Sequence, residues 1–355
     1  MRLSAAALAS LVISRTALCL VPPSIKLNNG VQMPLLSFGA NLYPEQTCRE
    51  ATRWAIQAGF RFIWSSEIIG EPCQRAQRAA IDESGVPRAE IFLAGTVNSQ
   101  ECTSLEDCYQ QTKASAEKQF VVLSSGKLDM LMLDYPSTFG CEGIKGQWKA
   151  FEELYAAGRA RSIAVSNFET EDLQCVASPG AIVPAVNQLR FNVGYGRRSL
   201  VGEHQRLGVA LQAYSPLGAG SVLKAPLLRQ IGQAHAKSSA QIALKWLVSQ
   251  GVAVNLASTN AEHLREDTEL FDFELSPSEM AQLNAKVPAT PSAMSKVEVM
   301  SDAAAALLPD QNPYLKLSHS LLVATLALVL TLVVVVRQLR SARTASRLED
   351  LEAFE

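Results

Sequence analysis

The sequence has little charge imbalance, few aromatic residues and no glycine-rich phosphate loop. Its 355 residues carry a formal net charge of −2, and aromatic residues make up 6%. A nucleic-acid-binding domain usually carries a basic stripe, so we expect no nucleic-acid partner. A doubly wound dinucleotide-binding domain usually has a GxGxxG motif after its first strand, and the chain has none. No Asn-X-Ser/Thr acceptor occurs, so glycosylation gives no support for a secretory route.

Cysteine is also sparse. The spacings of the seven cysteines fit neither a disulfide framework nor a metal motif, so we expect no metal site. Loss of an N-terminal leader would leave six, an even number that permits disulfides. In a domain of this size, buried free thiols are the simpler interpretation. The seven positions are Cys19, Cys48, Cys73, Cys102, Cys108, Cys141 and Cys175.

Residues 1–22 combine one early positive charge with an apolar stretch of about 12 residues and small residues after it. This pattern predicts a signal peptide or targeting leader, with Ala17 and Cys19 as the small residues before cleavage. Arg15 interrupts the apolar stretch, so an uncleaved leader stays open as an alternative. A bipartite plastid-type leader would begin in the same way.

Residues 317–336 read LSHSLLVATLALVLTLVVVV and contain no Asp, Glu, Lys or Arg. A run of about 20 such residues is long enough to cross a bilayer as a helix. The alternative is a buried helix of the globular domain, but such helices usually have a polar face and this segment is apolar all round. We therefore expect a transmembrane helix whose partner is the lipid bilayer. No protein partner is indicated.

The segments on either side of this helix predict its orientation. The tail 337–355 begins with a basic stretch, whereas only Lys316 immediately precedes the helix. The positive-inside rule places such a tail in the cytosol and the main domain in a lumen or outside the cell. Residues 288–316 are rich in proline and in small and polar residues, which is typical of a linker. The arginines of the tail are Arg337, Arg340, Arg343 and Arg347.

Between residues 25 and 287, short apolar runs alternate with longer helical stretches, several of which end in glycine. Eight such units predict an α/β fold of the TIM (β/α)8 barrel type over residues 25–287. A doubly wound sheet is the alternative, but it would need the missing phosphate loop. In a barrel the functional site lies where strands end and loops begin. The eight runs are 34–38, 60–64, 91–97, 128–135, 161–166, 184–189, 209–214 and 252–256.

Several segments of this region resemble the aldo-keto reductase family, in the family's order. Among them are KLNNGVQMPLLSFGANLY, LDMLMLDYP, GRARSIAVSNF, LQAYSPLG and STNAEHLREDTELFDFELSPSEM. The resemblance implies a TIM barrel that binds NAD(P)H without a Rossmann domain. It also implies a reaction in which the nicotinamide gives hydride to a carbonyl and a Tyr gives the proton. In the family a Lys paired with an Asp lowers the pKa of that Tyr, and a His orients the carbonyl.

The resemblance places these four catalytic positions on residues of other types. The family's Asp falls on Trp64, its Tyr on Ile69, its Lys on Thr96 and its His on Asp134. Ile69 has no proton to give, and Thr96 has no charge with which to lower the pKa of a neighbour. Trp64 is much bulkier than Asp and would fill space near the nicotinamide. The catalytic set is therefore intact at none of its positions.

Asp134 leaves alternatives open. As a carboxylate it would repel a developing alkoxide rather than stabilise it. Burial could instead raise its pKa and make it a proton donor. A carboxylate that faces solvent or caps a loop is the simpler interpretation. Glu67 is interpreted in the same way, as a charge on a loop.

The resemblance implies that part of the cofactor site persists. Ser166, Asn167 and Gln188 match the positions that hold the nicotinamide amide, and Tyr214 matches the residue that stacks on the ring. Two further positions of the family contact the pyrophosphate through their backbone. The alternative is that these residues persist because they pack the barrel rim. The two backbone positions fall on Ser215 and Leu217.

The adenosine end departs further from the family pattern. The Lys that pairs with the 2′-phosphate of NADP falls on Ala257, and an Arg falls on His263. Because charge-assisted contacts are the strong ones, NAD(P)H binding is expected to be weak and to favour NAD over NADP. Arg265 could substitute, although an arginine on a helix surface is commonly just solvated. The matching positions are Ser258, Thr259 and Glu266.

Three hypotheses follow from the sequence. The first is a membrane-anchored pseudoenzyme of the aldo-keto reductase fold that keeps a weak dinucleotide site. The second is an NAD(P)H-dependent oxidoreductase of carbonyl substrates that uses noncanonical residues. The third is a tethered scaffold without a ligand. Fold alone does not choose among them, because function depends on the site.

Overall fold

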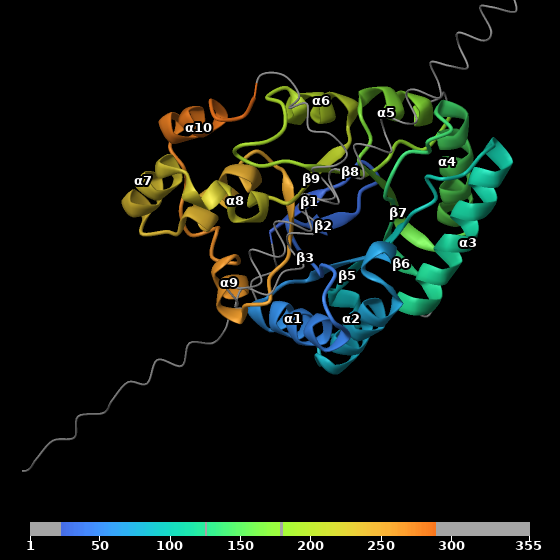
Figure 1. Ribbon diagram of the computed structural model, residues 1–355, viewed down its shortest axis with the longest axis horizontal. Coiled ribbons are helices and arrows are strands. Elements are labelled where there is room, and N and C mark those ends of the chain that lie inside the picture. The colour runs from blue at the N-terminus through green and yellow to red at the C-terminus, as the bar shows by residue number, and fades with distance from the viewer. Residues whose placement is uncertain (1–22, 125, 178–179, 289–355) are drawn as a thin grey trace, which may run out of the picture. The chain divides into compact units, whose positions relative to one another are not determined.

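The computed structural model describes residues 23–288 except 125 and 178–179, and its centre is a closed barrel of parallel strands (Figure 1). Every strand predicted from the apolar runs is present, with ends within two residues of the prediction. Around the barrel the strands are β3 (Leu36–Gly39), β4 (Phe62–Ser66), β5 (Phe92–Val97), β6 (Leu128–Leu133), β7 (Ala160–Ser166), β8 (Val186–Arg190), β9 (Ala210–Tyr214) and β10 (Ala253–Leu256), and β10 closes onto β3.

Helices surround the strands (Figure 1). The longer ones are α1 (Glu45–Ala58), α2 (Glu71–Glu83), α3 (Leu105–Leu123) and α4 (Cys141–Ala156). The shorter ones are α5 (Thr170–Val176), α6 (Leu200–Leu207), α7 (Pro226–His235), α8 (Ser239–Val248), α9 (Ala261–Glu266) and α10 (Pro277–Asn284). Single 3₁₀ turns lie at η1 (Glu67–Ile69), η2 (Arg88–Glu90), η3 (Gly218–Gly220) and η4 (Val222–Lys224).

Local chemistry accounts for where these helices begin and end. Helix α1 ends at Gly59, whose φ of 107° is left-handed and whose N–H donates to the carbonyls of Ala55 and Ile56. Helix α8 begins with a capping box, in which the Ser238 hydroxyl accepts from the backbone N–H of Gln241 and the Gln241 side chain accepts in return. Such caps set the residues at which these helices start and end.

An antiparallel hairpin, β1 (Ser24–Lys26) with β2 (Gln32–Pro34), precedes the barrel and was not predicted. The side chain of Asn29 donates to the carbonyl of Arg161, and that of Asn28 donates to the carbonyl of Pro184. These carbonyls lie at or just before the starts of β7 and β8. The hairpin therefore covers part of the N-terminal end of the barrel.

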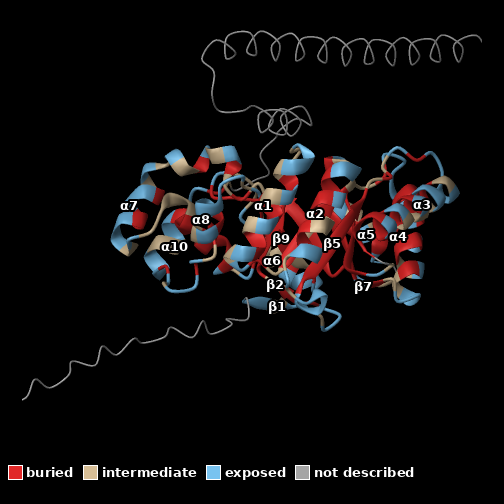
Figure 2. Cartoon of the chain, turned by 90° about the horizontal axis from the view of Figure 1, so that it is seen from below, coloured by how far each residue is buried: buried red, intermediate tan, exposed pale blue. Residues whose placement is uncertain are grey.

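The core lies between the strands and the inner faces of the helices, where buried residues concentrate (Figure 2). Aromatic rings fill part of it, with the centroids of Phe62 and Phe92 4.7 Å apart. Polar side chains also form a chain of hydrogen bonds across β8, β9, β3 and β10. In order, Gln188 donates to Gln212 at 2.9 Å, Gln212 to Ser37 at 3.1 Å and Ser37 to Asn255 at 2.8 Å.

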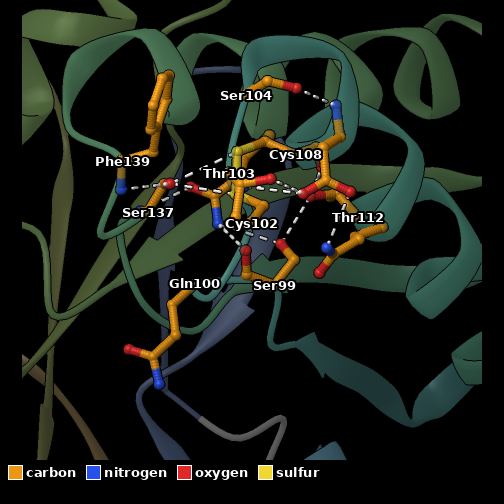
Figure 3. Close-up of a disulfide and its surroundings, with 12 residues drawn as sticks. Ser99, Gln100, Cys102, Thr103, Ser104, Cys108, Thr112, Ser137 and Phe139 are labelled. Carbon is orange, nitrogen blue, oxygen red and sulfur yellow. Dashed lines mark hydrogen bonds between the residues drawn. A yellow bond between two sulfur atoms is a disulfide. The ribbon is translucent and has the colours of Figure 1, made fainter.

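The expectation of free thiols is wrong for the six cysteines of the barrel, which pair as three disulfides. Elements distant in sequence bring two of the pairs together, which spacing alone does not reveal. Figure 3 shows the third, Cys102–Cys108, beside the hydroxyl of Ser137. The pairs are Cys48–Cys73 between α1 and α2, Cys102–Cys108 at the start of α3, and Cys141–Cys175 between α4 and α5.

The leader 1–22, the transmembrane segment 317–336, the tail 337–355 and all but the first residue of the linker 288–316 lie outside the described residues. In the part of the chain that the structure describes, no helix is both long and apolar enough to span a bilayer.

Candidate functional site

The residues at the catalytic positions of the family lie where consecutive strands end. Trp64 is on β4, Ile69 is on η1 directly after it, Thr96 is on β5 and Asp134 follows β6. Residues on neighbouring parallel strands are in register, and Ser66 pairs with Thr96. The structure therefore brings these replaced positions to one mouth of the barrel, where TIM-barrel sites are built.

Trp64 lies against the backbone of β3. A Cβ atom placed on Gly39 would come within 2.9 Å of the Trp64 ring and 2.7 Å of the Asn255 side chain. The indole N–H of Trp64 is buried and has no hydrogen-bond partner among the described residues. The tryptophan thus fills space at the mouth, while its ring nitrogen is an unused donor.

Two of the other replacements have no acid–base chemistry to offer. The Thr96 hydroxyl is buried and donates to the Ser66 hydroxyl at 2.8 Å. Ile69 is 9% exposed and packs in the core. Neither side chain supplies the proton or the positive charge that the family's Tyr and Lys supply.

Asp134 is buried, with 5% of its surface exposed, so the interpretation of a solvent-facing carboxylate is wrong. Burial raises its pKa to about 7, a hydrogen bond from Ser166 lowers it and the charge of Glu67 raises it. Glu67 is not a plain loop charge either. Its carboxylate accepts from the backbone N–H of Asn98 at 3.1 Å and from the Ser115 hydroxyl at 2.5 Å. These two bonds hold Glu67 in place near Asp134.

The four side chains expected at the nicotinamide are together at the ends of β7, β8 and β9. Asn167 donates to the backbone carbonyl of Asp134 at 2.9 Å and accepts from the Tyr214 hydroxyl at 3.1 Å. Asn167 also has a left-handed φ of 61°, which Asn tolerates better than most residues. Ser166 pairs in register with Gln188. Amide and hydroxyl groups therefore form a polar wall beside the Tyr214 ring.

The tyrosines at this wall do not have lowered pKa values. Burial is the main cause that raises the pKa of Tyr214 and of Tyr135, and the charge of Asp134 raises both further. An acid in the family's reaction needs the opposite shift, which a nearby Lys provides. These tyrosines are suited to stacking and hydrogen bonding.

The two positions expected at the pyrophosphate lie in the turn after β9. Ser215 has a left-handed φ of 48°, and its carbonyl accepts from the backbone N–H of Gly218 and from the Asn192 side chain, each at 3.0 Å. The Leu217 carbonyl accepts from the backbone N–H of Gly220 at 2.9 Å. Hydrogen bonds to the backbone carbonyls of Ser215 and Leu217 therefore hold the conformation of this turn.

The positions expected at the adenosine end follow β10. Ala257, Thr259 and His263 are exposed, and Glu266 is half-buried at the end of α9. The Ser258 hydroxyl accepts from the backbone N–H of Asn260 at 3.1 Å, so it caps the turn. No cation from these positions replaces the family's Lys and Arg.

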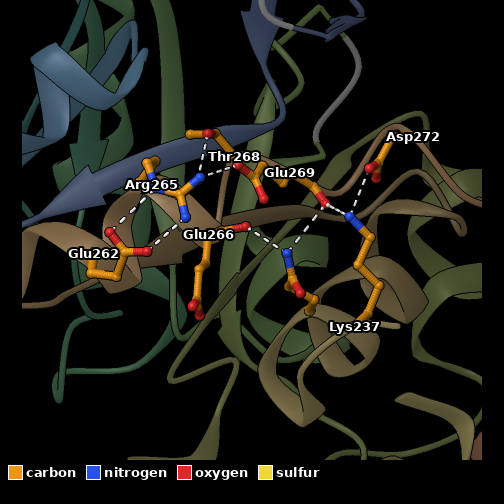
Figure 4. A network of polar contacts seen from close by, with 8 residues as sticks. Lys237, Glu262, Arg265, Glu266, Thr268, Glu269 and Asp272 are labelled. Carbon is orange, nitrogen blue, oxygen red and sulfur yellow. Dashed lines mark hydrogen bonds and ion pairs between the residues drawn. The ribbon is translucent and has the colours of Figure 1, made fainter. Parts of the chain in front are cut away.

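Arg265, the candidate substitute, is not simply solvated. Figure 4 shows its guanidinium between Glu262, which it contacts at 2.6 Å, and Glu269. These two carboxylates offset its positive charge. Nearby, burial raises the pKa of Asp267 to about 7, and the charge of Glu266 raises it further. At this end of the site, acidic side chains therefore outnumber basic ones.

Sequence reasoning missed the Glu67 contacts and the chain of polar side chains inside the barrel. A signal for the second was present, because Ser37, Gln188, Gln212 and Asn255 interrupt otherwise apolar strands. No sequence signal marked the bond between Glu67 and Ser115, since the two residues are 48 positions apart.

Comparison with known proteins gives a consistent result. Residues 35–288 match the Aldo/keto reductase family. A glyoxal reductase of Bacillus subtilis (strain 168) is 33% identical over 265 residues, which cover 74% of this chain and 92% of that protein. A morphine 6-dehydrogenase of Pseudomonas putida is 31% identical over 279 residues, which cover 74% and 90%.

Solved structures agree. An aldo/keto reductase from Brucella melitensis superimposes with a TM-score of 0.69 at 30% identity, covering 75% of this chain and 99% of that one. MGS-M4, an aldo-keto reductase enzyme from a deep-sea metagenome library, gives 0.70 at 25% identity, covering 76% and 97%. With a closed eight-stranded barrel and this match along nearly its whole described length, the chain belongs to the aldo/keto reductase family.

Proposed function

We propose that this chain is a pseudoenzyme of its family, a barrel that binds a nicotinamide dinucleotide weakly and no longer reduces carbonyls by the inherited mechanism. One observation carries the proposal. The catalytic positions hold Trp64, Ile69, Thr96 and Asp134, while the polar wall of Ser166, Asn167, Gln188 and Tyr214 is assembled beside them.

The loss of chemistry follows from the groups present. The family's proton transfer needs an acid whose pKa a neighbouring cation lowers, and the pKa values of Tyr135 and Tyr214 are raised instead. Thr96 is a neutral hydroxyl engaged with Ser66. Groups that act as a unit fail together, so loss of one of them can lower the rate nearly as much as loss of the whole set, and here all four are replaced.

The proposed cofactor is NAD(H) rather than NADP(H). A 2′-phosphate would meet Ala257 and His263 where the family has cations, and Arg265 is held by Glu262 and Glu269. The extra phosphate of NADP would have no cation to form charge-assisted hydrogen bonds with, and the acidic side chains at this end of the site would repel it. NAD(H), which has a ribose hydroxyl there, avoids both effects.

Calorimetric titration of the full-length chain with NADH and NADPH tests the proposal. We expect NADH to bind in the micromolar to millimolar range and NADPH at least about tenfold more weakly. Gln188→Ala should weaken NADH binding, whereas Lys118→Gln, an exposed change on α3, should not. No binding of either nucleotide at millimolar concentration to a folded chain would exclude the dinucleotide site and leave the scaffold hypothesis.

We also propose a single-pass membrane topology with the barrel in a lumen or outside the cell and the tail 337–355 in the cytosol. The hydropathy of residues 317–336 and the basic start of the tail support it. The disulfides of the barrel support the same compartment, because disulfides persist where conditions are oxidising. The partner of residues 317–336 is then the lipid bilayer.

A second candidate function is an oxidoreductase in which Asp134 gives the proton. The burial of Asp134 and its pKa of about 7 favour this reading, because such a carboxylic acid is partly protonated at neutral pH. Carbonyl substrates incubated with NADH and the full-length chain should then be reduced fastest below pH 7. Asp134→Asn should abolish the reaction but retain NADH binding, whereas a chain that binds NADH and oxidises none of it would exclude this candidate.

A further inference from the structure

A hollow lies at the opposite end of the barrel from the candidate site. Its walls come from the end of α2, the turn η2, the end of α3 and the starts of β5, β6 and β7. Its volume is about 550 Å³, within the range of small-molecule sites. No residue of the polar wall or of the catalytic positions contributes to it.

The floor of the hollow is apolar. Ile81, Leu93, Leu123 and Leu128 line it, and each is 3% exposed or less. These residues belong to the core cluster of the barrel. These side chains are almost wholly buried, so the floor is shallow, and exposed Ala89 and the aliphatic stems of the arginines extend the apolar surface open to a ligand.

The rim of the hollow is cationic. Arg78, Arg88, Lys127 and Arg161 line it, against the carboxylates of Asp82 and Asp129. Four positive side chains against two negative ones leave a balance of two positive charges. That balance matches the charge of a phosphate monoester above its second pKa.

Buried Asp129 orients two of these cations. Its carboxylate accepts from Arg88 at 2.9 Å, from Arg161 at 2.7 Å and from the backbone N–H of Leu93 at 3.0 Å. Asp129 is 6% exposed, so the two guanidinium groups are fixed over a carboxylate that has no room to turn away. Arg161 uses one terminal nitrogen for this ion pair, which leaves further N–H donors.

The other two cations have donors to spare. Arg78 uses its Nε to bind Asp82 at 2.8 Å, so its two terminal nitrogens remain. The ammonium of Lys127 is exposed and has no ion-pair partner among the described residues. A planar guanidinium fork and a mobile ammonium on one rim are the groups that proteins use to hold phosphate.

We propose that this hollow is a binding site for an aromatic or aliphatic phosphate monoester, with its apolar body on the leucine and isoleucine floor and its phosphate between Arg78, Lys127 and Arg161. The site is separate from the dinucleotide site and does not depend on it. The phosphate is held by charge-assisted hydrogen bonds, and Asp129 is a positioning residue that binds no ligand atom.

Calorimetry on the full-length chain in uncharged detergent tests the proposal with 1-naphthyl phosphate as the probe. We expect affinity to fall in the order 1-naphthyl phosphate, 1-naphthoate, 1-naphthol, because the balance of two positive charges favours the dianion. Inorganic phosphate should bind more weakly than 1-naphthyl phosphate, since it leaves the floor uncovered. Higher salt should weaken the binding. Equal affinity for the phosphate and 1-naphthol would overturn the proposal.

Variants locate the probe. Arg78→Gln combined with Lys127→Gln should weaken 1-naphthyl phosphate binding at least about tenfold, because two charge-assisted contacts are lost. Lys127 is exposed and Arg78 partly exposed, and the control Lys118→Gln with Lys145→Gln removes the same two positive charges from the outer faces of α3 and α4. Ala89→Trp, which places a ring in the hollow from exposed η2, should block binding with the rim charges intact. Unchanged affinity in both variants, or displacement of the probe by NADH, would overturn the proposal.

Discussion

At the scale of single residues, Asp134 couples the mouth of the barrel to stability. Its pKa is about 7 in the folded chain, against about 3.9 in an unfolded one. Between these values the folded chain holds a proton that the unfolded chain has released. The free energy of unfolding therefore falls as the pH rises from about 4 to about 7, and then levels off.

Asp134→Asn keeps the shape of the side chain and removes this titration. We expect the variant to exceed the parent in free energy of unfolding by about 2–4 kcal/mol at pH 8 and to match it near pH 4. Denaturant unfolding at both pH values measures the difference. Glu142→Gln, an exposed change on α4, is the control and should alter stability by less than about 0.5 kcal/mol. A variant less stable than the parent at pH 8 would contradict this reading of Asp134.

Gly39 is required for a steric reason rather than for backbone freedom. A methyl group there would lie 2.7 Å from Asn255 and 2.9 Å from the ring of Trp64, so one of them must move. We expect Gly39→Ala to lower the free energy of unfolding by about 1–3 kcal/mol. Gly202→Ala is the matched control, because nothing lies within 4 Å of the added methyl and the site is in helix α6. That control should be neutral or stabilising by up to about 1 kcal/mol, and equal losses in both variants would argue against the clash.

How much of the site the sequence predicts depends on which residue is considered. The positions of Ser166, Asn167, Gln188 and Tyr214 follow from motifs at strand ends, and the barrel brings strand ends together. The surroundings of Asp134 do not follow, because its burial depends on packing across several strands. The pairing of Arg265 with Glu262 and Glu269 could be predicted from helical spacing, because the partners are three and four residues away.

At the scale of elements, the disulfides connect the loops that carry the candidate site. Cys141 starts α4, directly after the loop that begins at Asp134, and Cys175 lies in α5, which follows Asn167. Cys141 is exposed and Cys175 is half-buried, whereas the other four disulfide-bonded cysteines of the described barrel are 2% exposed or less. A reductant therefore reaches the Cys141–Cys175 pair first.

Mild treatment of the folded chain with a dithiol should open this pair alone. We expect alkylation and mass spectrometry to show two newly labelled thiols, at Cys141 and Cys175, before any other disulfide-bonded cysteine is labelled. By the chain-entropy relation, a disulfide closing a loop of 34 residues contributes about 3–4 kcal/mol, so Tm should fall as the label appears. Cys141→Ser with Cys175→Ser should reproduce that loss without reductant. Earlier labelling of Cys48 or Cys102 would show that exposure does not set the order.

The elements themselves were largely predictable, and the one omission has a physical reason. Eight apolar runs of barrel strands stand out because a parallel strand is buried on both faces. The hairpin β1–β2 has strands of three residues each, too short for an alternating pattern to stand out. Its contacts with β7 and β8 come from Asn28 and Asn29, whose side chains act only once the barrel exists.

At the scale of the whole molecule, the barrel has two unlike ends. The mouth combines a buried acid with a polar wall and an acidic adenosine end, whereas the opposite end has a cationic rim around an apolar floor. TIM barrels usually keep function at the mouth and stability at the other end. Under the proposed function, replacement of the catalytic set at the mouth removes the inherited reaction but leaves the barrel that holds both ends in place.

At this scale the chain also includes the apolar residues 317–336, which follow the barrel and its linker. If this apolar segment enters a bilayer, the full-length chain should partition into the detergent-rich phase of a nonionic detergent on warming. A chain that ends at Pro291 lacks residues 317–336 and should stay in the aqueous phase if that segment is what enters the detergent. Placing arginines at Ala327 and Leu330 is the matched test of the segment, since each charge near a helix centre costs about 2.5–3.5 kcal/mol of insertion. Aqueous partitioning of the unmodified full-length chain would contradict the anchor, and with it the argument that the disulfides and the tail lie on opposite sides of one membrane.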